Sequence, residues 1–227
     1  MAEKIAAQWP GRLLQREFLL ASPLVVAPQL LGKILAIKSQ PAISAGRIVE
    51  VEAYLGPHHN PPDPAAHASR GVTPRNRVLF GAPGHAYVYS IYGQYFCMNI
   101  SCEAEGLAGC VLLRALEPIS GRDAMAANRG LTVAAKDRDL TGGPSRLCQA
   151  LGMTRELYNG VDLLDENSPL QLREDGFTPV AVQVTPRIGI REAVDWPLRF
   201  ALPGNDCVSG SKKTAGRTIP LSQLISI

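Results

Sequence analysis

Residues 47–55 read Arg-Ile-Val-Glu-Val-Glu-Ala-Tyr-Leu, and this stretch predicts a β-strand that carries two carboxylates. Side chains alternate between the two faces of a strand, so Glu50, Glu52 and Tyr54 are expected on one face. Ile48 belongs to the same set, and the valines and the alanine belong to the other. Two carboxylates on so apolar a strand are costly unless they are paired, hydrated or used in chemistry. Two interpretations stay open: an ion pair beside a wet edge, or a general base held against water.

The elements around this strand are short and follow no regular strand–helix alternation. The patterns predict strands at residues 33–38 and 110–116, a hairpin over 86–100, and short proline-broken strands between 163 and 202. They also predict one helix that begins at Ser22-Pro23 and two more at 121–129 and 144–151. A turn is expected at 39–46 and a long loop at 56–77. We therefore expect a mixed α/β fold in which short helices flank a curled, largely antiparallel sheet, like an open barrel or roll, with a protruding β-hairpin. Residues 13–227 are expected to form one domain after a flexible segment at 1–12.

The composition is that of an ordinary globular protein. The chain has 227 residues, of which 46% are hydrophobic and 19% are charged, and its net charge is +3. No apolar run reaches the roughly 18 residues of a membrane span, and the first residues lack the features of a signal peptide. Five cysteines without a C-x-x-C spacing indicate reduced, packed thiols rather than disulfides or a zinc site. A cytosolic protein is expected.

Tyrosines are concentrated in one part of the chain. Five of the six lie between positions 54 and 95, and strand propensity accounts for only some of them. Tyr92 precedes Gly93 at the expected hairpin tip, where a large ring has few neighbours to bury it. An exposed ring at such a tip fits a wedge that enters a DNA base stack, and the other tyrosines could stack on an extruded base.

Charged side chains offer two further hypotheses. The arginines expected to contact phosphates, if they gather beside the hairpin tip rather than on a solvated surface, are Arg70, Arg75, Arg77 and Arg146. The long loop also contains four residues of the types that bind metals, which are His58, His59, Asp63 and His67. Their spacing matches no common zinc pattern, so no metal and no other cofactor is expected.

Several blocks of sequence resemble the alkyladenine (3-methyladenine, or N-methylpurine) DNA glycosylase family. They are residues 47–57, Ala66-His67, 73–77, 87–93, 95–99, 111–118, 143–151 and 197–200, in order along the chain. The resemblance implies a monofunctional glycosylase that flips alkylated or deaminated purines from duplex DNA and hydrolyses the N-glycosidic bond. The lesions would be of the 3-methyladenine, 7-methylguanine, hypoxanthine and ethenoadenine class, and an abasic site would remain for base excision repair.

The resemblance also implies roles for individual residues. Glu52 would activate the hydrolytic water, with Arg114 helping to hold that water or the adjoining phosphate. Tyr54, Tyr89 and His67 would enclose the extruded base. Asn99 would exclude the amino group of guanine, and Tyr92 would fill the gap in the duplex. The partner would be double-stranded DNA with damaged purines, and the protein would act as a monomer that does not bind membranes. It would be located in the cytoplasm, associated with the nucleoid, in a bacterium or in the nucleus of a eukaryote.

The sequence departs from the family pattern at three places and leaves two rival functions open. The departures are the proline-rich segment 58–64, Gln94 after the wedge position, and Cys207 at a position where the family commonly has tryptophan. They bear on which lesions are accepted and on how tightly the duplex is bound. One rival is a metal-dependent hydrolase that uses the loop histidines and Asp63, with Glu52 as base. The other is a binding module whose tyrosines stack on single strands without catalysis.

Overall fold

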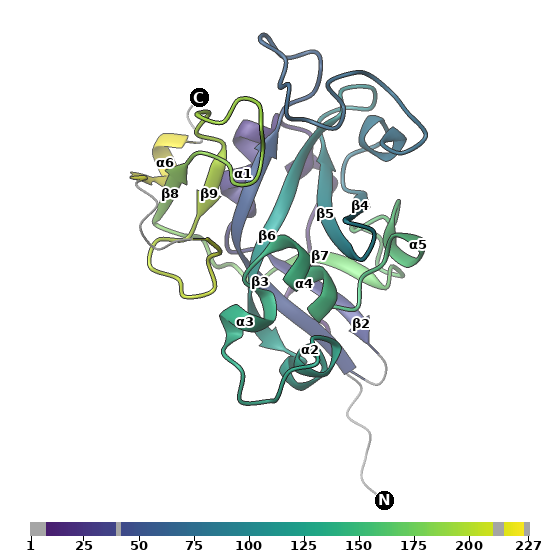
Figure 1. Ribbon diagram of the computed structural model, residues 1–227, viewed down its shortest axis with the longest axis vertical. Coiled ribbons are helices and arrows are strands. Elements are labelled where there is room, and N and C mark those ends of the chain that lie inside the picture. The colour runs from purple at the N-terminus through teal and green to yellow at the C-terminus, as the bar shows by residue number, and fades with distance from the viewer. Residues whose placement is uncertain (1–7, 40–41, 211–215, 225–227) are drawn as a thin grey trace, which may run out of the picture.

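The computed structural model describes residues 8–39, 42–210 and 216–224 (Figure 1). The strands are β1 (Arg12–Leu13), β2 (Ile34–Ser39), β3 (Ala42–Tyr54), β4 (Ala86–Ile91), β5 (Tyr95–Cys102), β6 (Gly109–Ser120), β7 (Leu170–Glu174), β8 (Ala181–Thr185), β9 (Arg199–Ala201) and β10 (Arg217–Pro220). The helices are α1 (Pro23–Leu30), α2 (Arg122–Asn128), α3 (Asp137–Thr141), α4 (Pro144–Ala150), α5 (Arg155–Tyr158) and α6 (Leu221–Leu224), with 3-10 helices η1 (Arg16–Leu19) and η2 (Arg77–Phe80).

The strands form one antiparallel sheet. Its main path runs β1-β7-β2-β3-β6-β5-β4. A branch begins where β9 pairs with residues 50–52 of β3, and it continues from β9 to β8 and from β8 to β10. All of these pairings are antiparallel, and within the described ranges the sheet is not closed because β1 and β4 do not pair. The mixed α/β fold with a largely antiparallel sheet is therefore confirmed. β4 and β5 pair from Ala86–Ile100 to Ile91–Tyr95, with residues 92–94 in the turn.

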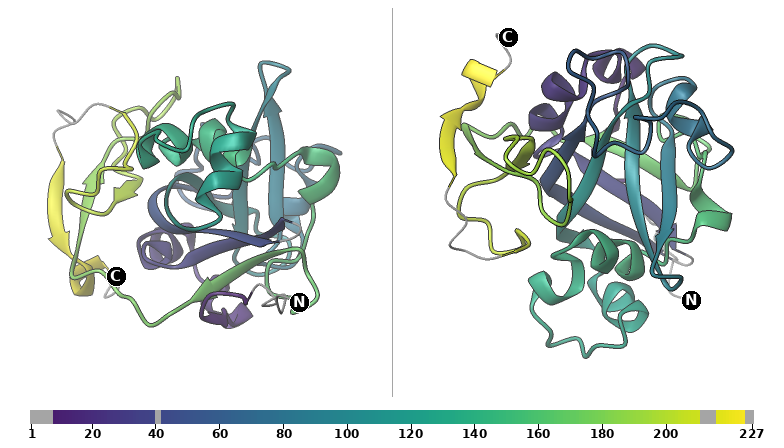
Figure 2. Two further views of the ribbon diagram at one scale, coloured as in Figure 1. Left: turned by 90° about the horizontal axis from the view of Figure 1, so that it is seen from below. Right: turned by 45° about the horizontal axis from the view of Figure 1, so that its top comes forward.

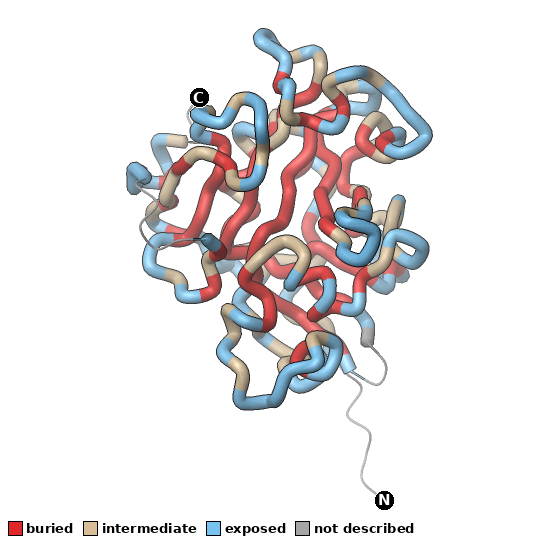
Figure 3. The backbone as a smooth tube through the Cα atoms, in the orientation of Figure 1, coloured by how far each residue is buried: buried red, intermediate tan, exposed pale blue. Residues whose placement is uncertain are grey.

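β3 is the central strand, and it is buried along nearly its whole length. Ten of its residues are buried, at 43–46 and 48–53, and Arg47 between them is half-buried. Helix α1 packs against β3 and β6, while α4 packs against β5 and β6. Figure 3 shows these strands as the buried centre of the molecule, with exposed loops around them. Any polar side chain on β3 therefore needs partners inside the protein.

Helix α1 begins as its sequence predicts. The Ser22 side chain accepts a hydrogen bond from the Leu24 backbone N–H at 3.3 Å, and Pro23 occupies the first helical position. This serine satisfies one of the amide groups that a helix start leaves free, and proline has no amide to lose there. The helix then presents Val26, Ala27 and Leu30 to the core.

Two local predictions are wrong. The predicted turn at 39–46 is mostly strand, since β3 starts at Ala42 and pairs with β2 as far as Ser39. The strict alternation on β3 fails between Ile48 and Glu50, where the pairing with β6 shifts register and Ile48 joins the apolar core cluster. A β-bulge of this kind inserts an extra residue and re-aims the side chains beside it. Glu50 and Glu52 remain as neighbouring buried carboxylates.

The first described residues pack against the rest of the protein. Residues 1–7 of the segment expected to be flexible lie outside the described residues, whereas Trp9 packs against a small core cluster and Arg12 in β1 is opposite Glu174 in β7. In the described part of the chain, every helix is too short or too polar to cross a membrane.

Candidate active site

A pocket of about 540 Å³ opens beside the β4–β5 hairpin. Its walls come from the end of β3, the hairpin, β6, the start of α4, and the loop that precedes β9; the lining residues are Tyr54, Ala65, His67, Tyr89, Ile91, Tyr92, Cys97, Asn99, Cys110, Leu112, Arg114, Pro144, Ile188, Gly189 and Ile190. The volume lies in the roughly 300–1,000 Å³ range of sites that take small organic ligands. Segments that are far apart in sequence thus bring six predicted site residues to one cavity.

Glu52 lies directly behind the wall of this pocket. It exposes no surface, and its Oε1 accepts hydrogen bonds from the Ile188 backbone N–H at 2.8 Å and pairs with Arg114 Nη1 at 3.0 Å. Its Oε2 accepts the Tyr54 hydroxyl at 2.9 Å. Burial and the neighbouring Glu52 carboxylate raise the pKa of Tyr54, so this phenol stays a neutral donor. Three donors therefore orient this carboxylate directly behind the pocket wall.

Arg114 reaches both carboxylates of β3 because of an irregularity in its own strand. Glu50 is opposite Ala115 and Val51 is opposite Leu113, so Arg114 is an extra residue at a register shift in β6. Its Nε donates to Glu50 Oε1 at 2.8 Å, and its Nη1 lies 3.0 Å from Glu52 Oε1. Burial lowers the pKa of Arg114, but Glu52 and Glu50 raise it more strongly. The guanidinium therefore stays charged and holds the two carboxylates in place.

Glu50 is satisfied inside the protein and does not line the pocket. Arg199 Nε donates to its Oε1 at 2.7 Å, and the Ser209 hydroxyl and backbone N–H donate at 2.8 and 2.5 Å. Burial raises the pKa of the Glu50 carboxyl, yet Arg114, Arg199 and the Ser209 amide lower it further, and the net shift is downward. A carboxylate with this many donors is a structural anion. Of the two interpretations for β3, pairing therefore describes Glu50.

The aromatic side of the pocket is formed by β4 and the long loop of residues 56–77. The Tyr87 and Tyr89 rings stack with centroids 5.4 Å apart, and the His67 ring meets Tyr89 edge-on at 4.6 Å. His67 Nδ1 lies 3.1 Å from the Tyr87 hydroxyl. Burial and the nearby Arg75 lower the pKa of His67, so the imidazole is neutral at pH 7. Tyr87 is fully buried behind this wall, whereas Tyr89 and His67 line the pocket and offer flat, uncharged surfaces of the kind on which a base stacks.

Tyr54 is supported from behind by a buried ion pair. Arg187 lies 4.5 Å from the centroid of the Tyr54 ring and pairs with Asp63 at 2.5 Å. Asp63 also accepts the Leu55 backbone N–H at 3.2 Å, which ties the long loop to the end of β3. Both side chains of the pair are fully buried. Asp63 is therefore a structural residue of the pocket wall.

The hairpin tip and the Asn99 side chain behave very differently toward solvent. Tyr92 is 90% exposed and adopts a positive φ of 50°, next to Gly93 at 70°. Asn99 is 4% exposed at the pocket wall, and its amide makes no hydrogen bond to any other described side chain or backbone group. The tip ring is available to another molecule, and the amide is available to whatever enters the pocket.

The four predicted phosphate-binding arginines are all exposed. Arg75 lies 5.7 Å from the Tyr89 ring, beside the hairpin. Arg146 lies on α4, two residues after the pocket residue Pro144, and is 3.7 Å from Asp139. Arg70 lies in the long loop, and Arg77 is the first residue of η2.

The four-residue metal cluster of the rival hypothesis does not assemble. Asp63 is engaged by Arg187, and His67 faces Tyr87 and Tyr89. His58 and His59 instead turn toward Glu103. The five cysteines are all buried and free, as the spacing predicted.

Several important residues were missed by reasoning from the sequence. Arg187, Arg199 and Ser209 complete the buried network, and Ile188 supplies a backbone donor to Glu52. One signal was available, because Arg199 stands between leucine and phenylalanine in a short apolar segment and so required a buried anion. The amide of Ile188 carries no signal in its residue type.

Comparison with known proteins gives a consistent result. A family model described as methylpurine-DNA glycosylase matches residues 17–206. A protein of Koribacter versatilis, named as a 3-methyladenine DNA glycosylase, is 50% identical over 199 residues, which cover 88% of this chain and 94% of that one. Similarly named proteins are 48% identical in Burkholderia orbicola, covering 92% of this chain and 96% of the relative, and 48% identical in Methanoculleus marisnigri, covering 81% and 92%.

Proposed function

The chain belongs to the methylpurine-DNA glycosylase family and is a DNA N-glycosylase, and we propose that it flips alkylated or deaminated purines out of duplex DNA and hydrolyses their N-glycosidic bond. The proposed lesions are 3-methyladenine, 7-methylguanine, hypoxanthine and ethenoadenine. The observation that supports this best is a buried carboxylate, Glu52, which contacts the lining residues Tyr54, Arg114 and Ile188 directly behind the wall of an aromatic pocket. The glycosylase domain is residues 13–227, and it acts as a monomer.

The chemistry assigns separate tasks to the residues around the pocket. Cleavage of an N-glycosidic bond passes through a sugar with oxocarbenium character, which a nearby carboxylate stabilises while it aligns a water molecule. Glu52 takes that role, and Arg114 with the Ile188 amide holds its Oε1 so that the second oxygen serves as base. Since Glu52 exposes no surface and its Oε2 accepts the Tyr54 hydroxyl, water reaches Oε2 when that hydroxyl moves aside.

The aromatic walls select the base. Tyr54, Tyr89 and His67 enclose a flipped purine, and a positively charged alkylated purine gains cation–π attraction from neutral tyrosine rings. Such a base leaves without further protonation, so one carboxylate is enough. A neutral base such as hypoxanthine needs a proton on leaving and is the slower substrate.

The experiment is base release from duplexes that each carry one lesion, followed by alkaline cleavage of the abasic product. Glu52→Gln keeps the shape of the side chain, so we expect it to fold and bind lesions while losing on the order of 10²–10⁴-fold in excision. Glu117→Gln is the matched control, because it neutralises an exposed glutamate on β6. A Glu52→Gln variant that excises 3-methyladenine at the parental rate would exclude Glu52 as the general base. A parent protein that releases no nucleobase would instead be a DNA-binding module without catalysis.

A further inference from the structure

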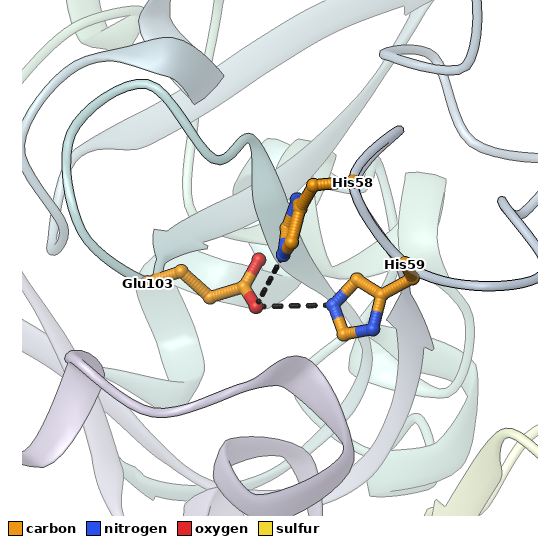
Figure 4. Close-up of side chains that lie close together, drawn as sticks. All are labelled: His58, His59 and Glu103. Atoms are coloured by element: carbon orange, nitrogen blue, oxygen red, sulfur yellow. Dashed lines mark hydrogen bonds and ion pairs between the residues drawn. The ribbon is translucent and has the colours of Figure 1, made fainter.

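Three side chains away from the pocket converge on one point (Figure 4). His58 Nε2 and His59 Nε2 lie 3.2 and 3.0 Å from the same oxygen, Oε1 of Glu103. The two imidazole centroids are 4.3 Å apart, and one potential ligand atom from each residue lies within 4.8 Å of the others. Adjacent residues of the long loop thus meet the segment that joins β5 to β6.

The backbone is shaped to permit this arrangement. A Cβ at Gly56 would lie 2.8 Å from the His58 ring, and a Cβ at Gly109 would lie 2.1 Å from Glu103 Oε2. Glu103 itself has a φ of 72°, a left-handed conformation that glycine adopts more readily, and its N–H donates to the Leu19 carbonyl at 2.8 Å. Two glycines and one strained residue therefore make room for the three side chains.

The Glu103 carboxylate is incompletely satisfied. Glu103 is 5% exposed, and its buried Oε2 has no hydrogen-bond partner among the residues that the structure describes. Buried carboxylate oxygens normally have a donor or a cation beside them. Both neighbouring imidazoles are directed to Oε1, so Oε2 is left for a cation that the carboxylate would bind through both of its oxygens.

We propose that His58, His59 and Glu103 bind a divalent transition-metal ion of the zinc class. Two imidazoles and a carboxylate are ligands that such ions accept. In a tetrahedral site with ligand bonds of about 2.0–2.1 Å, neighbouring ligand atoms are roughly 3.3 Å apart. The observed nitrogen–oxygen separations of 3.2 and 3.0 Å are close to that spacing, and all three ligand atoms lie within 4.8 Å of one another.

The ion would act as a second anchor of the long loop. Asp63 already ties this loop to Arg187 behind Tyr54, and the metal would tie its first residues to the β5–β6 connection. The loop continues to His67 at the pocket, so the ion stabilises one wall of the site without entering the chemistry. This inference does not depend on which lesions are excised.

The test uses the full chain with any affinity tag removed, titrated with ZnCl₂ by calorimetry after treatment with chelator. We expect one ion per chain, a higher melting temperature with zinc, and slower proteolysis within residues 56–67. The double variant His58→Ala/His59→Ala is expected to lose this binding, and Glu103→Gln, which preserves side-chain shape, to weaken it strongly. His85→Gln and Glu105→Gln are matched controls that retain it, since both residues lie outside the cluster.

Cobalt distinguishes this site from the buried thiols. Co²⁺ bound by nitrogen and oxygen gives visible ligand-field bands without a thiolate charge-transfer band. Absence of zinc binding in the parent, equal binding in the double variant, or a thiolate band with cobalt would each overturn the proposal. In those cases the three side chains are a hydrogen-bonded cluster only.

Discussion

Replacing Tyr92 with serine removes a ring from the hairpin tip that the protein itself scarcely buries. Tyr92 is 90% exposed, so it buries roughly 20 Å² of the 150–250 Å² that a fully buried aromatic side chain contributes. At about 25 cal/mol per Å², this corresponds to about 0.5 kcal/mol of unfolding free energy. Tyrosine and serine are both disfavoured at a φ of 50°, so the backbone term nearly cancels. We therefore expect the variant to melt within a few degrees of the parent.

The same substitution is expected to impair the handling of duplex DNA. If the ring fills the gap left by a flipped base, its loss removes a stacking interaction worth about 1–3 kcal/mol, or about 5- to 150-fold in the population of the flipped state. Excision of a paired lesion falls by that factor. Excision from single-stranded or mismatched DNA falls much less, because little unstacking is required there.

The assay compares single-turnover excision from paired and single-stranded substrates, with fluorescence of a 2-aminopurine beside the lesion as a direct report of flipping. Val180→Ser is the matched control, because Val180 is also 90% exposed but lies outside the pocket lining. Thermal unfolding of both variants checks the fold. A Tyr92→Ser variant that flips bases normally, or one that unfolds far earlier than Val180→Ser, would refute the assignment of the wedge.

The remaining predictions concern selectivity, DNA affinity and acid stability. Asn99→Ala opens space at the pocket wall, so we expect excision of guanine-derived bases to rise relative to adenine-derived ones; an unchanged ratio would contradict the role of this amide. Arg75→Ala and Arg77→Ala should each reduce the slope of log affinity against log salt by about one, equally on damaged and undamaged duplexes, and a changed lesion preference at constant slope would assign the residue to the pocket. Hydrogen bonds from Arg47 hold the pKa of Asp175 at about 2, below the ordinary value of 3.8. The stability from this pair is present above pH of about 4 and is lost as the pH falls through about 2, so urea unfolding of Asp175→Asn should show a weaker pH dependence in that window.

The local features of the site followed from the sequence because each depends on neighbouring residues. The apolar run at 47–55 determined a buried strand with two glutamates, and Ser22-Pro23 determined the start of a helix. The Tyr92-Gly93 pair determined a hairpin turn with an exposed ring. Strand alternation, capping and turn conformation act over a few residues, so they can be read along the chain.

Only the tertiary structure decided which groups each glutamate contacts. Glu50 and Glu52 are two residues apart and equally buried, yet Glu50 is neutralised by Arg199, which lies 149 positions later, while Glu52 meets the Ile188 amide behind the pocket. The difference comes from register shifts in β3 and β6 and from the way β9 packs beside them. The meeting of His58 and His59 with Glu103 has the same origin. Local preferences set which segments become strands, but the register and packing of distant segments determine which side chains meet, and that choice depends on the free energy of the whole fold.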